Sequence, residues 1–201
     1  WDAATGACIL TLRNHTAKVN SVAWDHTGDV LASASGDGAI RLWNSTGLTH
    51  TISTDSYVWS AAWSPTAHVL ASGSQDYAVN LWDATTGHRI WTLSGHTGQV
   101  NGVAWDHKGG VLASASEDGT IKFWDSTSRV CIKTLRGNGD PVKSLAWNPA
   151  RNLLASSSRR EAAWTVSVWD TTTGACISTL RGDVVTDNTC TVWNPTGDVL
   201  A

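Results

Sequence analysis

The sequence predicts an all-β protein in which a four-stranded antiparallel unit is repeated along one chain. Steps of 39, 42, 42 and 46 residues separate Trp24, Trp63, Trp105, Trp147 and Trp193. Steps of 42, 39, 42 and 45 residues separate a second tryptophan series, Trp1, Trp43, Trp82, Trp124 and Trp169. Internal periods of about 40 to 45 residues are typical of repeated β units. In addition, no segment of ten or more residues has the apolar period of a helix.

The first complete repeat begins with two predicted strands. Residues 19–24 (VNSVAW) alternate apolar and polar side chains, as a half-buried strand does. The polar and glycine residues at 25–29 predict a turn. Residues 30–35 (VLASAS) predict a second strand, whose small side chains suit a crowded inner position of the fold.

Two further strands complete the repeat. A tight turn at 36–38 (GDG) leads to a third strand at 40–43 (IRLW). After a turn at 45–47 comes a fourth strand, which is clearest in a later copy at 176–180 (CISTL). One such sheet cannot bury both of its faces, whereas sheets stacked radially around an axis can. We therefore predict a β-propeller, with large tryptophan side chains in the wider gaps between blades further out.

Composition limits the classes of function. The formal net charge is −3 and charged residues make up 15% of the chain, so binding to nucleic acid is not expected. No apolar run reaches the roughly 18 residues needed to span a bilayer, and no signal-peptide pattern opens the sequence. We therefore expect neither a membrane nor a nucleic acid as the partner.

The cysteines occupy one repeated position rather than forming pairs. Cys8, Cys131 and Cys176 each lie seven residues after a repeat-ending tryptophan. Equivalent positions in neighbouring blades should lie well beyond the roughly 5.5 Å between Cα atoms that a disulfide prefers. We expect free, buried thiols, as in an intracellular compartment, either cytoplasm or nucleus.

These features give the chain a family resemblance. Trp-Asp pairs stand at 1–2, 82–83, 124–125 and 169–170, with Trp-Asn as a variant at 43–44 and Gly-His at 95–96. The sequence resembles the WD-repeat family over its whole length. That resemblance implies a non-enzymatic scaffold for other proteins or peptides, without a cofactor, within a larger complex or a longer chain.

We predict a single domain over residues 1–201, with repeat boundaries near 1–44, 45–83, 84–125, 126–170 and a partial repeat at 171–201. The family most often closes with seven blades, which favours an arc of a longer propeller. A five-bladed ring, in which Trp1 and Asp2 complete the last blade, is the alternative. Trp1 and Ala201 should be far apart in the first case and close together in the second.

The resemblance also implies a hydrogen-bonded group inside each blade. A buried Asp and a buried indole N–H both need partners, and a histidine can relay between them. Two repeats carry the full set, namely His15, Ser33 (or Ser35), Asp37 and Trp43, and His96, Ser114, Asp118 and Trp124. The second repeat keeps Asp76 and Trp82, but Thr54 replaces its histidine; Asn138 and Asp183 do so in later repeats. Because the pair recurs, we interpret it as structural rather than catalytic.

A second set of positions is implied to line the top of the central channel. It comprises Asn20, Trp59, Asn101, Lys143 and Thr189, followed by Gly36, Gln75 and Glu117. Trp59 stands where the other repeats have polar or charged residues. A solvent-facing Trp is an expected hot spot for binding. The alternative is that Trp59 fills space left by the absent histidine of its repeat.

Other chemical motifs are absent from the sequence. There is no Cys-x-x-Cys, no His-x-x-x-His and no phosphate-binding glycine loop, so no metal or cofactor is expected. A substrate receptor or adaptor of a larger complex, such as a ubiquitin ligase, is the alternative function. The Trp-Asp-x-Arg pattern that one version of that role uses is missing. A subunit of an RNA-associated complex has only Arg159 and Arg160 in its favour.

Overall fold

The computed structural model describes residues 2–137, 139–160, 163–182 and 190–201, in which all regular elements are β-strands. Its sixteen strands form four antiparallel four-stranded sheets, here called blades 1 to 4. Each blade is a meander in which consecutive strands pair. Within the described ranges, no helix has the length and apolar character needed to cross a bilayer. The predicted fold class is therefore confirmed.

The strand bounds repeat from blade to blade. Blade 1 contains β1 (Val19–Trp24), β2 (Leu31–Ser35), β3 (Ala39–Asn44) and β4 (Gly47–Ser53). Blade 2 contains β5 (Val58–Trp63), β6 (Val69–Ser74), β7 (Val79–Asp83) and β8 (Arg89–Leu93). Blade 3 contains β9 (Val100–Trp105), β10 (Val111–Ser116), β11 (Thr120–Asp125) and β12 (Cys131–Arg136). Blade 4 contains β13 (Val142–Trp147), β14 (Leu153–Arg160), β15 (Ala163–Asp170) and β16 (Cys176–Gly182).

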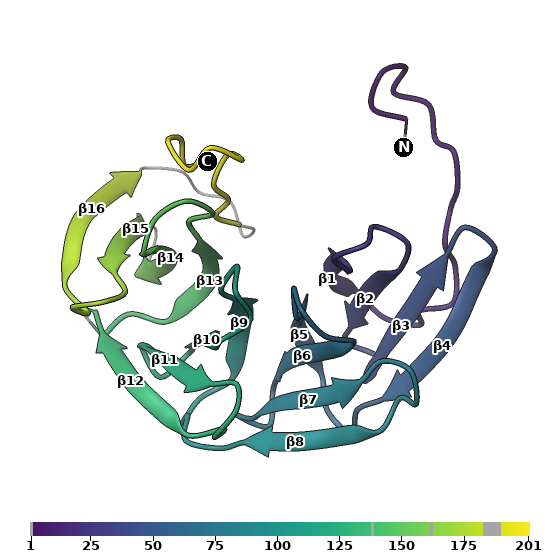
Figure 1. The fold of residues 1–201 in the computed structure, drawn as a ribbon, viewed down its shortest axis with the longest axis horizontal. Helices are drawn as coiled ribbons and strands as arrows, with labels where there is room; N and C mark the ends of the chain where they lie inside the picture. Colours follow the sequence, from purple (N-terminus) through teal and green to yellow (C-terminus); the bar gives the residue numbers. More distant parts are fainter. Residues whose placement is uncertain (1, 138, 161–162, 183–189) are drawn as a thin grey trace.

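The blades stand side by side around one centre. In Figure 1 they form an open arc, with the first strand of each blade innermost and the fourth strand outermost. The expectation that the small-residue strand is innermost was wrong, because β2 and its counterparts lie second. The predicted repeat boundaries also fall inside the sheets, since β4 follows the boundary at residue 44 yet pairs with β3.

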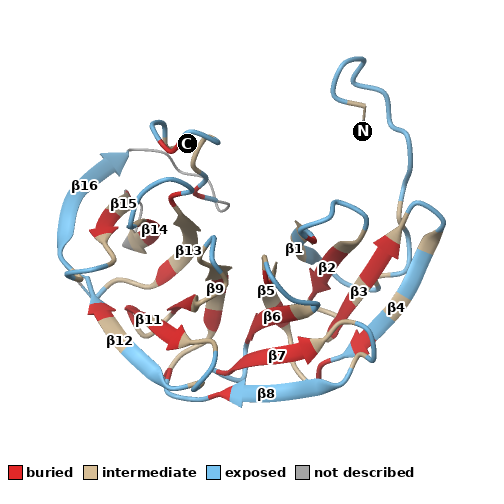
Figure 2. Cartoon of the chain, in the orientation of Figure 1, coloured by how far each residue is buried: buried red, intermediate tan, exposed pale blue. Residues whose placement is uncertain are grey.

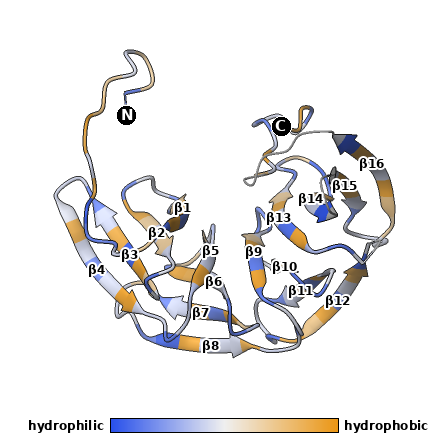
Figure 3. Ribbon diagram, turned by 180° about the vertical axis from the view of Figure 1, so that it is seen from behind, coloured by the Kyte–Doolittle hydropathy of each residue, from blue (hydrophilic) through white to orange (hydrophobic). Residues whose placement is uncertain are grey.

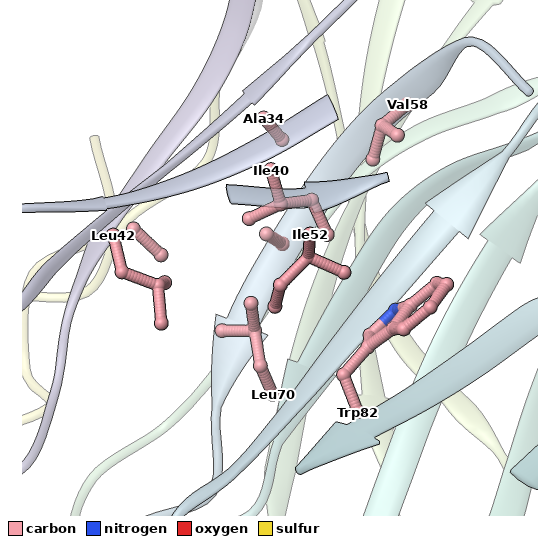
Figure 4. Close-up of a cluster of buried hydrophobic side chains, with 9 residues drawn as sticks. Ala34, Ile40, Leu42, Ile52, Val58, Leu70 and Trp82 are labelled. Carbon is pink, nitrogen blue, oxygen red and sulfur yellow. The ribbon is translucent and has the colours of Figure 1, made fainter. Parts of the chain in front are cut away.

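Side-chain alternation explains how one blade packs against two neighbours. Successive strand residues point to opposite faces of a sheet. In β6, Leu70 therefore packs against blade 1 while Ala71 packs against blade 3. Figure 4 shows the first of these cores, which includes Ile40 and Ile52 of blade 1 and Trp82 of blade 2. In Figure 2 the middle strands are accordingly the most buried and the outer strands the most exposed.

A repeated hydrogen bond ties each inner strand to the blade before it. The indole N–H of the strand-ending tryptophan donates to a backbone carbonyl at 2.9 to 3.2 Å. The four bonds run from Trp63 to Ala23, from Trp105 to Ala62, from Trp147 to Ala104 and from Trp193 to Ala146. These tryptophans lie between neighbouring blades and do not line the central cavity: Trp105 shares an inter-blade pocket with Ile90 of β8, and Trp147 shares one with Ile132 of β12, in keeping with the expected place of tryptophan in the gaps between blades.

The ends of the chain extend the pattern only in part. Trp193 forms an isolated antiparallel bridge with Leu200, which corresponds to the first two strands of a further blade. Trp24, before which the described residues form no further blade, is 60% exposed. The choice between a longer propeller and a five-bladed ring depended on the separation of Trp1 from Ala201. Trp1 lies outside the described residues, so that choice stays a prediction.

The cysteines differ from the expectation in one respect. All four are free, but each is exposed rather than buried. Cys131 and Cys176 begin the outermost strands, where only one neighbouring strand covers them. The same position leaves Ile132 and Ile177 more than half exposed, and Figure 3 shows apolar patches along β12 and β16. The prediction of the compartment, which rested on the thiols, stays a prediction.

Candidate interaction site in the central cavity

The inner strands of the four blades surround a cavity of about 760 Å³. Five of the predicted channel residues line it, namely Asn20, Trp59, Asn101, Glu117 and Lys143. They converge because each occupies a corresponding place at the start of an inner strand or in the turn after the second strand. The cavity therefore gathers side chains that are about 40 residues apart in sequence.

Two other predicted channel residues do not line this cavity, and a third lies outside the described residues. The ring of Tyr57 lies over Gly36, where a Cβ atom would approach the ring to 2.3 Å. Gln75 is exposed in its turn and does not line the cavity. Thr189 lies outside the described residues, as do Asn138 and Asp183. The expectation that Gly36 lines the channel was wrong, because Tyr57 covers it. The place of Gln75 on the channel rim stays a prediction.

Two asparagines connect neighbouring blades at the cavity wall. The amide nitrogen of Asn20 donates to the carbonyl of Val58 at 2.8 Å. Asn101 makes the same bond, also at 2.8 Å, to the carbonyl of Val142. An amide side chain can donate to a neighbouring backbone and still present a polar surface to the cavity. These residues therefore both hold the blades together and line the site.

Trp59 occupies the corresponding position in blade 2 and makes a different bond. Its indole N–H donates to the side-chain oxygen of Gln99 in blade 3 at 2.8 Å. Its ring centroid lies 4.4 Å from that of Tyr57, at a tilt of 41°. The residue is half-buried, so part of the ring faces the cavity. Trp59 thus packs between blades and also lines the site, and its role as a binding hot spot stays a prediction.

An ion pair crosses from blade 3 to blade 4 at the same wall. The ammonium group of Lys143 contacts the carboxylate of Glu117. The amide of Asn101 donates to the same carboxylate at 3.2 Å. Glu117 is consequently half-buried and paired, rather than turned to solvent.

The structural hydrogen-bond group is complete in blade 3. Trp124 donates its indole N–H to Ser114 Oγ at 2.8 Å, and Ser114 lies 2.8 Å from His96 Nε2. His96 Nδ1 lies 2.9 Å from Asp118. An indole can only donate, so the single hydroxyl proton of Ser114 is left for His96 Nε2. The proton on Nδ1 then goes to Asp118, so the side chains of Trp124, Ser114, His96 and Asp118 form one continuous series of hydrogen bonds.

Blade 1 has the same arrangement with one addition. His15 bridges Ser33 and Asp37 at 2.7 and 2.9 Å, and Trp43 donates to Ser33 at 2.8 Å. Of the two candidate serines, Ser33 is therefore the one in the relay. Arg41 adds a positively charged partner for Asp37 at 2.7 Å.

Blade 2 lacks the complete structural hydrogen-bond group, although it carries Asp76 at the aspartate position. The indole N–H of Trp82 still donates to Ser72 Oγ at 2.8 Å. The hydroxyl of Thr54, however, donates to the backbone carbonyls of Gly38 and Ser56. Without a histidine to bind it, Asp76 is exposed and accepts a bond only from the backbone of Ala78 among the described contacts. The expectation of a structural role for Asp76 inside the blade was wrong for this reason.

Burial and hydrogen bonding set the protonation of the blade 3 group. Burial raises the pKa of Asp118, but hydrogen bonds from Thr120, Thr97 and His96 outweigh that effect and lower the pKa to about 2. Burial lowers the pKa of His96 below its ordinary value of 6.5, and the contact with Asp118 offsets this only in part. At neutral pH the pair is therefore a carboxylate beside a neutral imidazole, which agrees with the hydrogen-bond directions above.

Sequence reasoning missed several residues of the cavity. Lys18, Gln99 and Arg159 line it together with the predicted set. Lys18 and Gln99 both lie two residues before the asparagine position of their strands. The alternation of a strand places such residues on the same face, and this pattern could have identified them. Among the described residues, no group of three His, Cys, Asp or Glu side chains could hold a metal ion.

Comparison with known families agrees with the repeat pattern. Residues 61–148 match the family described as Anaphase-promoting complex subunit 4 WD40 domain. Residues 6–44 and 129–170 match the family described as WD domain, G-beta repeat. The two matches together extend over most of the chain.

Individual relatives match over about one repeat. A stretch of 47 residues is 49% identical to nuclear distribution protein PAC1-2 of Uncinocarpus reesii, covering 23% of this chain and 10% of that protein. A stretch of 44 residues is 43% identical to retinoblastoma-binding-like protein E of Dictyostelium discoideum, covering 22% of this chain and 8% of that protein. A third, also of 44 residues, is 48% identical to the WD repeat-containing protein 26 homolog of Arabidopsis thaliana, covering 21% and 8%. The matches thus span about a tenth of each relative or less.

Proposed function

Because this chain belongs to the WD-repeat family, we propose that it is a non-enzymatic scaffold which binds a peptide segment of another protein in its central cavity. Proteins of this family generally serve as scaffolds for protein interactions. The observation that carries the proposal is the cavity of about 760 Å³, which combines the half-buried ring of Trp59 with polar side chains from all four blades. Such a mixture of apolar surface and a few placed polar groups suits ligand recognition.

The histidine and aspartate residues support binding rather than catalysis. His96 and Asp118 are committed to a closed chain of hydrogen bonds inside blade 3. The same chain occurs in blade 1 around His15. A group that recurs in equivalent blades and binds its own tryptophan has a structural task, so we assign it no reaction.

Affinity capture of the full chain tests the scaffold function. Trp59→Ala should lose bound proteins that the unchanged chain retains, as measured by quantitative mass spectrometry. Trp91→Ala is the matched control, because Trp91 is an exposed tryptophan on the outer strand of the same blade. Proteins that are retained equally by all three chains would contradict binding in the cavity.

A second proposal is that the chain acts as a substrate receptor or adaptor within a larger complex. The match of residues 61–148 to a domain named for a subunit of the anaphase-promoting complex favours it. Native purification should then yield the chain in constant ratio with other subunits. An RNA-associated role predicts instead that capture is lost after RNase treatment and falls steeply with salt. If the chain elutes alone under native conditions, that result would argue against both the receptor or adaptor role and the RNA-associated role.

A further inference from the structure

One turn of blade 3 holds an arginine where the corresponding turns hold glycine. Between the third and fourth strands, the backbone N–H of Gly87, Arg129 and Gly174 each donates at 2.8 Å to the carbonyl of the aspartate four residues earlier. Their φ angles are 73°, 63° and 82°, so Arg129 has the left-handed conformation of its glycine counterparts. That conformation is unfavourable for a residue with a Cβ atom. An arginine kept there is a candidate for a functional role.

The side chain of Arg129 reaches from blade 3 to blade 2. Its guanidinium carbon lies 4.1 Å from the centre of the ring of Trp91, on the outer strand β8. Among the described residues, no carboxylate forms an ion pair with Arg129. Asp125, in the same turn, accepts hydrogen bonds from Thr127 and Ser128 instead. The ring therefore orients the guanidinium without neutralising it, and its N–H groups can bind an anion.

Arg129 also lines a pocket of about 200 Å³ between blades 2 and 3, here called the Arg129 pocket. No described residue lines both this pocket and the central cavity. Its apolar wall includes Leu81, Ile90 and Trp105, and the indole N–H of Trp105 is already bonded to Ala62. Pockets that enclose whole small ligands measure about 300 to 1,000 Å³, so this smaller one suits a single side chain.

The equivalent pocket between blades 3 and 4 differs in its charges. Ile132 lines it in the place that Ile90 has in the Arg129 pocket. Lys133 there donates to two backbone carbonyls of blade 4, and Arg151 pairs with Asp198 at 2.9 Å. Its lysine and its arginine thus have partners within the described part of the chain. The Arg129 pocket combines a similar apolar wall with a cation that has no such partner.

We propose that the Arg129 pocket is a second docking site, which binds a segment of a partner protein through an apolar side chain next to an aspartate or glutamate. The apolar side chain packs against Ile90 and Trp105, because this contact removes both surfaces from water. The neighbouring carboxylate accepts hydrogen bonds from the guanidinium of Arg129, whose planar group matches a carboxylate. The site lies outside the central cavity and goes beyond the function proposed for that cavity.

Nuclear magnetic resonance of the full chain, with isoleucine methyl groups labelled, tests the site. The chain has seven isoleucines, and Ile90→Val identifies the signal of Ile90 by its loss. The main peptide has a leucine between two glutamates in a chain of serines. Three others replace the glutamates with glutamines or lysines, or the leucine with serine. The main peptide should shift the Ile90 signal saturably and bind about threefold or more tighter than the other three. The Ile132 signal should shift less.

Arg129→Gly separates binding from stability, because it restores the residue of the equivalent turns. Glycine adopts the left-handed conformation readily, so the melting temperature should stay close to that of the unchanged chain. The glutamate and glutamine peptides should then bind equally. Arg129→Asn is a second variant, since asparagine tolerates the same conformation and also lacks the charge. Arg89→Ala is the control, because Arg89 is an exposed cation on β8 that does not line the pocket. It should keep the preference for glutamate.

Several outcomes would overturn the docking site. They are equal binding of the glutamate and glutamine peptides to the unchanged chain, equal binding without the leucine, an equal shift at Ile132, and no saturable shift at Ile90. A clear fall in the melting temperature of Arg129→Gly, with the glutamate preference retained, would make Arg129 a structural link between blades instead.

These results leave the proposed scaffold function to its own test, because Trp59 lines only the central cavity. In the capture experiment, proteins lost with Trp59→Ala but kept with Trp91→Ala depend on the cavity. Proteins lost with Trp91→Ala but kept with Trp59→Ala would support the Arg129 pocket.

Discussion

The indole N–H of Trp59 in blade 2 donates a hydrogen bond of 2.8 Å to the side-chain oxygen of Gln99 in blade 3. Neutral hydrogen bonds of this kind contribute about 1 kcal/mol to stability. Trp59→Phe keeps a ring beside Tyr57 but loses the bond, so we expect a loss of about 1 kcal/mol in the free energy of unfolding. Trp59→Ala should lose more, because the inter-blade packing goes as well.

A double-mutant cycle checks the bond itself. Urea unfolding of the unchanged chain, Trp59→Phe, Gln99→Ala and the double variant should give a coupling energy of about 0.5 to 1.5 kcal/mol. Strict additivity of the two single changes would mean that the two side chains do not bind each other in solution.

The aspartates of two equivalent turns should differ in their effect on stability. Asp118 binds His96, Thr97 and Thr120, so Asp118→Ala should lower the free energy of unfolding by about 2 to 3 kcal/mol. Asp76 is exposed in the corresponding turn of blade 2. Asp76→Ala should cost well under about 1 kcal/mol. Thermal and urea unfolding measure both, and similar losses would show that the blade 3 group is not the source of stability.

The tryptophans that end the inner strands should also separate into two classes. Trp105 donates to the carbonyl of Ala62 in the blade before it at 3.2 Å. Trp105→Phe should therefore lower the free energy of unfolding by about 1 kcal/mol or more. Trp24 ends β1, the corresponding inner strand of blade 1, and is 60% exposed. Trp24→Phe should change the stability by less than about 0.5 kcal/mol, and an equal loss would refute the role of the inter-blade bond.

Stability should fall in two steps as the pH is lowered. The pKa of His96 is lower in the folded chain than its ordinary value of 6.5, so the unfolded state binds more protons just below that pH. Stability is thus lost as the pH falls below about 6.5. The pKa of Asp118 is lowered from 3.8 to about 2, so a second loss follows below about pH 4 and continues towards pH 2.

Urea unfolding between pH 7 and pH 2 measures both steps. His96→Gln is less stable overall, but its stability should depend less on pH between 7 and 5 than that of the unchanged chain. If the variant keeps the full slope in that range, His96 is not the group responsible for the first step.

Much of the fold could be predicted because each repeat carries its own local signals. The strand at Val19–Trp24 has the bounds that its alternation predicted. The hairpin of blade 4 is harder to predict, because residues 158–160 are all polar, yet β14 and β15 pair as far as Arg160 and Ala163. Continued pairing with a neighbouring strand overrides local composition, and a sequence pattern does not contain that information.

The candidate site was predictable only in part. The family resemblance implied the positions of Asn20 and Asn101 through their repeat offsets, and both line the cavity. Gly36 has the same kind of offset but is covered, because Tyr57 from the next blade lies over it. Offsets give the place of a residue within its own blade, whereas exposure depends on which side chain the adjacent blade supplies.

The sequence by itself determined the repeated four-stranded unit and, through the family resemblance, the histidine relays at His15 and His96, since both depend on spacing within one repeat. Only the tertiary structure decided that Asp76 is exposed, that Trp59 binds Gln99 and that Lys18, Lys143 and Arg159 share one cavity. The physical reason is that these relations join different blades. Radial stacking brings residues about 40 or more positions apart into contact, and the identity of each pair is set by packing between blades rather than by the periodicity that forms them.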